Sequence, residues 1–198
     1  MFKRLPLIFT FAAMLVGTAF AQNPIWVEGA AGLALPTDSD FRDAYNSGMT
    51  LGGRAGYGLS STIDATGTLK YNRYKFDNAQ SIVEATLTSI NLMVGGRYKF
   101  PSESKLGYEA GSEIGLSRLA IDINNPDIIL GKTADSQIRF EGDSSTKFAW
   151  SVLGTVTYNV VASTFLFVSP SFNLIFADNN AHHLDFTVGA RFLVSGGE

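Results

Sequence analysis

The sequence contains no cysteine and, after its first twenty residues, no hydrophobic run long enough to cross a membrane as a helix. Without cysteine the chain can form no disulfide and can carry no lipid anchor on a thiol. Every apolar stretch after Phe20 is interrupted by Gly, Ser, Thr, Asn or a charged residue, whereas a spanning helix needs about 20 apolar residues. The sequence therefore excludes a lipoprotein and argues against an α-helical membrane protein.

Charge is also scarce in this chain. Charged residues make up 17% of the sequence, against about 25% in typical soluble domains, while aromatic residues reach 12%. The formal net charge is −3, so the chain lacks the basic surface that binding to nucleic-acid phosphates requires. This composition is typical of a β protein with a large apolar exterior, and nucleic acid is not an expected partner.

The N-terminus has the three-part layout of a secretory signal peptide. A basic stretch ends at Lys3-Arg4, an apolar run extends from Leu5 to Phe20, and Ala19 and Ala21 supply the small residues before a cleavage site. The apolar run is shorter than a membrane-spanning helix requires. The sequence predicts a signal peptide over residues 1–21 and a single mature domain over residues 22–198.

Apolar and polar residues alternate with a period of two in eight segments of the mature chain, which predicts eight β-strands. Each segment reaches or exceeds the 9–11 residues of a tilted membrane strand, and single-chain bacterial barrels have even strand numbers. The predicted fold is an all-β, eight-stranded, antiparallel, up-and-down transmembrane β-barrel. The segments are 25–35, 49–59, 63–76, 90–100, 106–121, 148–160, 165–176 and 184–194.

The connections between these segments alternate between short and long, as in outer-membrane barrels. The short turns are expected on the periplasmic side with both termini, and the long loops outside the cell. Aromatic residues near the strand ends predict two girdles at the membrane interfaces. The periplasmic girdle would comprise Tyr57, Tyr98, Tyr108, Tyr158, Phe165, Phe167 and Phe192. The outer girdle would comprise Tyr71, Tyr74, Phe76, Phe148, Phe172 and Phe176.

Two places fit the strand pattern poorly. Pro170 lies inside the seventh segment, where it removes a ladder hydrogen bond, and a β-bulge is expected there. The stretch from Lys70 to Phe76 alternates irregularly, so this half of the third segment is expected to rise above the membrane.

The strand face opposite the apolar one carries five acidic and five basic residues. An eight-stranded barrel has room inside only for side chains, and unpaired buried charge is costly. We therefore expect a salt-bridged network that closes the lumen. The alternative is that several of these residues lie near the rims and stay solvated. The ten residues are Glu28, Arg54, Asp64, Lys70, Arg97, Lys99, Glu109, Glu113, Asp185 and Arg191.

Catalytic and metal-binding patterns are weak. The pair His182-His183 has Asp185 nearby, but adjacent strand residues point to opposite faces, so a solvated loop pair is the simpler interpretation. The candidate nucleophiles Ser144, Ser145 and Ser171 lie in no recognisable catalytic motif. No enzyme activity, metal or cofactor is therefore predicted.

Two stretches of residues resemble the small OmpA/OmpX-like outer-membrane β-barrel family. Gly32-Leu33-Ala34-Leu35-Pro36, followed by Phe41 to Gly48, is similar to the first strand and loop of such barrels. Val188-Gly189-Ala190-Arg191-Phe192 resembles their C-terminal assembly signal. The resemblance implies a monomer in a Gram-negative outer membrane, surrounded by lipid and inserted by the barrel-assembly machinery. It implies nothing about activity.

Fold alone does not determine function, and the sequence leaves four alternatives. The first is a structural or surface-interaction barrel that presents its long loops to an extracellular ligand. The second is a narrow channel for small or apolar solutes, and the third is a lipid-modifying enzyme. A soluble carrier barrel of the lipocalin type is a rival at the level of the fold, and would need a polar exterior around an apolar cavity.

Overall fold

The computed structural model describes residues 23–76, 85–123, 127–129, 137–139, 144–177 and 181–195. The predicted signal peptide, residues 1–21, lies outside the described residues. No helix within the described ranges is long and apolar enough to span a membrane.

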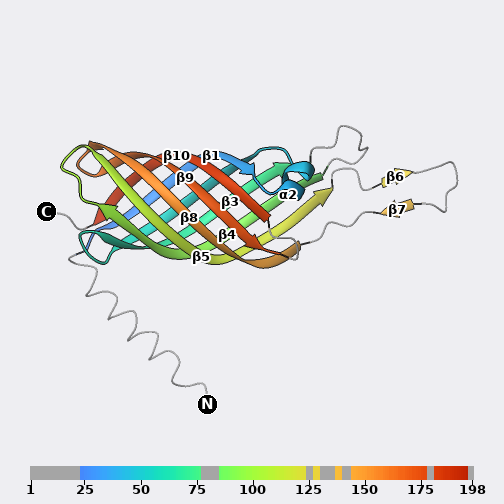
Figure 1. The fold of residues 1–198 in the computed structure, drawn as a ribbon, viewed down its shortest axis with the longest axis horizontal. Coiled ribbons are helices and arrows are strands. Elements are labelled where there is room, and N and C mark those ends of the chain that lie inside the picture. Colours follow the sequence, from blue (N-terminus) through green and yellow to red (C-terminus); the bar gives the residue numbers. More distant parts are fainter. Residues whose placement is uncertain are drawn as a thin grey trace, which may run out of the picture.

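Eight antiparallel strands close into one barrel, in which each strand pairs with its neighbours in the chain and the last strand pairs with the first (Figure 1). The predicted up-and-down eight-stranded barrel is therefore confirmed. Its strands are β1 (Ile25–Pro36), β2 (Gly48–Gly58), β3 (Ile63–Lys75), β4 (Ala85–Phe100), β5 (Leu106–Ile123), β8 (Ser144–Val161), β9 (Thr164–Phe176) and β10 (Ala181–Ser195). Outside the barrel, α2 (Ser39–Ala44) follows β1, and β6 (Asp127–Ile129) pairs with β7 (Gln137–Arg139).

Side chains alternate between the barrel interior and the outer wall, because successive strand residues point to opposite faces. The exposed large hydrophobic side chains belong to the outward positions, and Leu51 and Leu92 are 61% and 62% exposed. The buried positions are mostly polar, with Asp64, Asn72 and Ser117 at 0% exposure. The barrel is thus apolar outside and polar inside.

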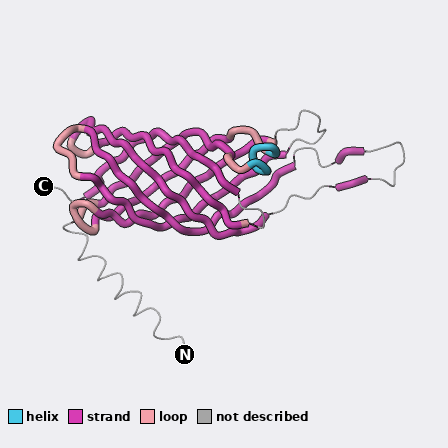
Figure 2. The backbone as a smooth tube through the Cα atoms, in the orientation of Figure 1, coloured by secondary structure: helices cyan, strands magenta, loops and turns pink. Residues whose placement is uncertain are grey.

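The described connections between strands lie at the two ends of the barrel (Figure 2). The turns at 59–62, 101–105 and 162–163 lie at the end where β1 begins and β10 ends, and the connection that contains α2 lies at the other end. We call these the turn end and the loop end. This segregation agrees with the prediction from connection lengths.

Strand β3 continues in regular pairing to Lys75, so the irregular stretch at Lys70 does not leave the barrel. Lys70, Asn72 and Tyr74 alternate as buried residues with exposed Tyr71 and Arg73. The alternation was hidden in the sequence because polar and aromatic residues occupy both faces of this half of the strand.

Pro170 causes no β-bulge, and that prediction was wrong. The β8–β9 register is the same on both sides of the proline, with Leu153 opposite Ser171 and Val156 opposite Val168. Between these pairs the ladder is interrupted, and the Ser169 hydroxyl donates to the Gly154 carbonyl oxygen at 2.9 Å. A side chain thus supplies a hydrogen bond where proline has no N–H to donate.

At the loop end, α2 contributes to a small apolar cluster that packs on the barrel mouth. Phe41 packs edge-to-face on Tyr45 and Tyr74, with ring centroids 5.4 Å and 5.0 Å apart, and Ala34 and Leu87 complete the buried cluster. Tyr74 is only 1% exposed, so it does not belong to the predicted outer girdle. It lies three residues from Tyr71, and an odd spacing places two strand residues on opposite faces.

Candidate functional site

The distinctive chemistry of this molecule is the charge inside the barrel. All ten charged residues expected on the inner face lie there, and each forms at least one ion pair with another of the ten. Eight of the ten are buried, and Arg54 and Lys99 are partly buried. The structure divides them into one network of six residues and two separate pairs.

Glu28 is the centre of the six-residue network. Its carboxylate accepts from Arg54 at 2.9 Å, from Arg97 at 2.8 Å and from Arg191 at 2.7 Å. The strand register explains two of these contacts, because Glu28 on β1 lies directly opposite Arg54 on β2 and Arg191 on β10. Arg97 belongs to β4 and reaches Glu28 across the barrel interior.

Two further glutamates complete this network. Glu109 accepts from Arg97 at 2.9 Å and from Arg191 at 2.6 Å. Glu113 accepts from Arg54 at 2.9 Å and from the Thr68 hydroxyl at 2.9 Å. Three carboxylates therefore balance three guanidinium groups. Charge-assisted hydrogen bonds of this kind offset the cost of removing the ions from water.

Trp26 supports the network from the turn end, although the sequence analysis did not select it. The Arg191 guanidinium carbon lies 4.4 Å from the indole centroid and that of Arg97 lies 5.1 Å away, within cation–π range. The indole N–H donates to Asp64 at 2.9 Å, and Asp64 pairs with Lys99 at 2.7 Å. The available signal was the even spacing from Glu28, which places Trp26 on the inner face.

The second separate pair lies towards the loop end. Lys70 donates to Asp185 at 2.7 Å and to Asn173 at 3.2 Å. His183 lies 3.6 Å from the same Asp185, and its ring contacts the Asn72 amide at 3.2 Å. This cluster continues the polar interior beyond the six-residue network.

The interpretation of His182 and His183 as a solvated loop pair was wrong. Both belong to β10, and His183 is 1% exposed in the interior, whereas His182 faces outward beside Phe172. Among the described residues, no group of three or more His, Asp or Glu side chains could hold a metal ion. Ser171 is buried, and its hydroxyl contacts Lys70 at 3.5 Å and Asn173 at 3.3 Å.

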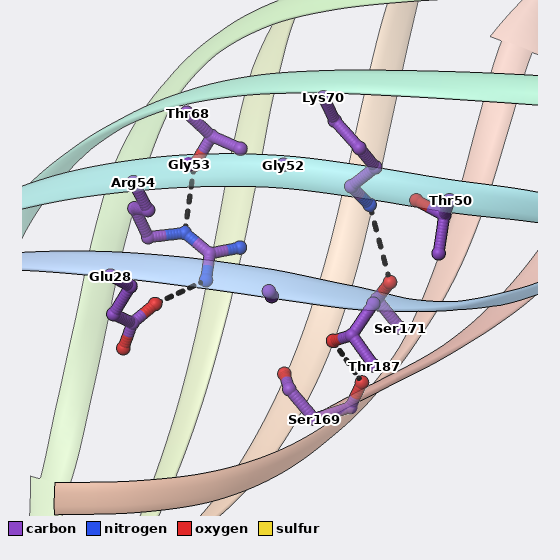
Figure 3. A pocket seen from close by; sticks show the side chains of 11 residues that line it. Glu28, Thr50, Gly52, Gly53, Arg54, Thr68, Lys70, Ser169, Ser171 and Thr187 are labelled. Carbon is purple, nitrogen blue, oxygen red and sulfur yellow. Dashed lines mark hydrogen bonds and ion pairs between the residues drawn. The ribbon is translucent and has the colours of Figure 1, made fainter. Parts of the chain in front are cut away.

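A small cavity separates the six-residue network from the Lys70–Asp185 pair (Figure 3). Its volume is about 30 Å³, which is the space of one or two water molecules. Arg54 and Lys70 approach it from opposite ends, and hydroxyl groups line its wall (Figure 3). The hydroxyls belong to Thr50, Thr68, Ser169, Ser171 and Thr187.

The predicted periplasmic girdle lies at the turn end, but two of its members do not face outward. Tyr98, Tyr108, Tyr158 and Phe192 are 44–50% exposed on the outer wall, and Tyr57 is half-buried. Phe165 and Phe167 occupy the inner face of β9, and Phe167 is 4% exposed. The sequence misled here because their outward neighbours, Leu166 and Val168, are equally apolar.

A closed barrel with an apolar wall and a charged, hydrogen-bonded interior is the reverse of a soluble carrier barrel. Such a surface requires a hydrocarbon environment, and closure leaves no strand edge with unsatisfied backbone groups. The fold and the interior together define a small transmembrane β-barrel of the outer-membrane type.

Comparison with solved structures supports this class. The chain is similar to Neisserial surface protein A (TM-score 0.60, 21% identity, 85% of this chain and 96% of that chain). It is also similar to a major outer membrane protein from Thermus thermophilus (TM-score 0.57, 12% identity, 86% and 99%). A third similar structure is the outer membrane protein OprG from Pseudomonas aeruginosa (TM-score 0.55, 11% identity, 89% and 97%).

These likenesses establish the fold that the resemblance in the sequence had suggested, a small outer-membrane barrel. No protein-family model matches the sequence, and a search of curated proteins found no match.

Proposed function

We propose that this protein is an integral outer-membrane barrel with a closed lumen and a structural or surface-interaction role, without enzymatic activity. The observation that carries the proposal is the complete pairing of the ten predicted charges inside the barrel. The cavity between Arg54 and Lys70 has a volume of only about 30 Å³, and a larger pocket of about 280 Å³ lies at the turn end beside Asp64 and Lys99. The long connections at the loop end would face the outside of the cell and contact extracellular ligands.

The energetics of the interior support a closed lumen. An ion crossing the barrel would have to displace Arg97 and Arg191 from Glu28 and Glu109. Breaking one buried pair costs about 3–5 kcal/mol, and these four side chains share several such bonds. The apolar cluster of α2 adds a second barrier at the loop end.

Conductance in planar lipid bilayers tests this proposal. We expect the purified native protein to show no stable open channel. A double variant Arg97→Ala/Glu109→Ala removes one acid and one base from the most crowded part of the lumen, keeps the net charge, and is expected to conduct ions.

The matched control for that double variant is Glu103→Ala/Lys105→Ala. It removes an exposed acid and base from the turn at 101–105 and is expected to stay silent. A large, stable channel in the native protein would overturn the closed lumen and favour the narrow-channel alternative.

We also propose that residues 1–21 are a cleaved signal peptide, that the assembly machinery of the outer membrane inserts the barrel, and that it is a monomer. The basic, apolar and small-residue segments of the N-terminus support the first point. Mass spectrometry of protein from the outer-membrane fraction should find Gln22 as the first residue, and light scattering in detergent should find one chain per particle.

A further inference from the structure

Formal charges on the outer wall of the barrel occur in one place only among the described strand residues. Outward positions of β1, β2, β4, β8, β9 and β10 carry no Asp, Glu, Lys or Arg. The exceptions are Arg73 and Lys75 on β3 and Arg118 and Asp122 on β5, and all four are exposed. They belong to the loop-end halves of these strands.

The strand register places the two arginines close together. β4 lies between β3 and β5, and it pairs Thr88 with Arg73 and Ile90 with Arg118. Two interstrand steps and a two-residue offset separate their Cα atoms by about 12 Å. Lys75 lies two residues beyond Arg73 on the same face, about 7 Å away. Flexible arginine side chains can converge on one ligand across such a distance.

None of the three cations takes part in an ion pair with another described residue. The nearby acid is Asp122 on β5. It pairs with Thr86 on β4, and Thr86 pairs on its other side with Lys75 on β3. Asp122 therefore offsets part of the charge of Lys75, and the two arginines dominate this surface.

On the turn-end side of these cations, the outer wall formed by β3, β4 and β5 is apolar. Tyr71 on β3, Ile90 on β4 and Leu116 on β5 are 38%, 47% and 54% exposed. Cations above an apolar wall match an amphipathic ligand whose anionic head lies at the membrane interface and whose hydrocarbon chains lie below it.

We propose that Arg73 and Arg118, assisted by Lys75, bind the phosphate groups of a phosphorylated glycolipid in the outer leaflet, whose acyl chains lie along Tyr71, Ile90 and Leu116. Guanidinium groups recognise phosphate through paired hydrogen bonds. The site rests on the proposed outer-membrane location, because it requires the loop end to face the outer leaflet. It does not depend on whether the lumen conducts.

Native mass spectrometry of the detergent-solubilised protein titrated with diphosphorylated lipid A tests the site. We expect one bound lipid A on the native barrel. The variant Arg73→Gln/Arg118→Gln is expected to bind it roughly thirtyfold more weakly, at about fivefold for each charge removed near an anionic lipid surface. Chemically dephosphorylated lipid A is expected to bind the native barrel as weakly as lipid A binds the variant.

The matched control is Arg42→Gln, which removes an exposed cation from α2 at the same end of the barrel and should leave binding unchanged. Because all the substituted side chains are exposed, each variant should retain the folded, heat-modifiable band on a gel. Equal binding of lipid A by the native protein and the double variant would overturn the proposal, as would equal binding of its dephosphorylated form. Neither result would alter the conductance test of the closed lumen.

Discussion

Arg191 and Glu28 form an ion pair of 2.7 Å across the seam that closes the barrel, although 163 positions separate them in the chain. β10 and β1 meet at this seam, and the register places the two residues directly opposite each other. The pair therefore joins the first strand to the last. Because Glu28 also binds Arg54 and Arg97, one carboxylate connects the seam to the opposite wall.

Replacing Glu28 with Gln should destabilise the barrel by about 3–5 kcal/mol, the usual cost of leaving buried charge unpaired. Three guanidinium groups would lose their shared carboxylate while the side-chain volume stays nearly constant. Urea unfolding in lipid vesicles, followed by the fluorescence of Trp26 and Trp150, measures this change. Glu103→Gln in an exposed turn is the control, and equal stability of both variants would contradict the structural role of the network.

The same seam should not tolerate a side chain at Gly189. A Cβ there would clash with the Gly29 carbonyl oxygen of β1 and would lie 2.7 Å from Phe167 Cζ. Overpacking of this kind costs about 1–3 kcal/mol, so Gly189→Ala should lower the folded fraction after refolding into lipid. Gly67→Ala is the matched control, because no atom lies within 4 Å of the added methyl group. Identical refolding of the two variants would show that the seam can shift freely.

The stability of the β8–β9 contact at Pro170, where the backbone ladder is interrupted, should depend on the Ser169 hydroxyl. This group contacts the Gly154 carbonyl oxygen and the Thr155 hydroxyl, both at 2.9 Å. Ser169→Ala should therefore cost about 1–3 kcal/mol, because a buried acceptor loses its donor. Hydrogen exchange should become faster for backbone amides near Gly154, whereas Ser163→Ala in the neighbouring turn should leave exchange unchanged. An unaltered exchange rate in the first variant would mean that this bond does not stabilise the β8–β9 contact.

The destabilisation caused by a cation introduced on the outer wall should increase with its depth in the bilayer. Leu92 lies midway along β4, where it is 62% exposed, and Leu59 lies in a turn, where it is 59% exposed. Leu92→Arg should destabilise the folded barrel by about 2–4 kcal/mol, as at a bilayer midplane, and Leu59→Arg by at most about 1 kcal/mol. Folding titrations in phospholipid vesicles compare the two. Similar losses at both positions would contradict a membrane that surrounds the middle of the barrel.

The fold followed from the sequence because a barrel strand has a simple period. Outward residues such as Leu92 and inward residues such as Glu113 differ in polarity, and the alternation fixes the face of each. Where the residues on the two faces of a strand have the same polarity, the period of two does not show which residues point inward. For that reason the sequence placed Phe165 and Phe167 on the wrong face, and it did not reveal the alternation after Lys70 within the predicted segment 63–76.

The sequence also indicated ten charges that enter the interior as five acids and five bases, but it missed Lys147, which occupies an inward position of β8 opposite Ser117. It could not determine which acid binds which base. Asp64 lies opposite Arg97 in the register but pairs with Lys99, while Arg97 reaches Glu28 and Glu109. Those choices depend on strand tilt, on side-chain length and on the space that Trp26 occupies. Only the closed tertiary structure brings these atoms within hydrogen-bond distance, because a network that crosses a barrel exists only once the barrel has closed.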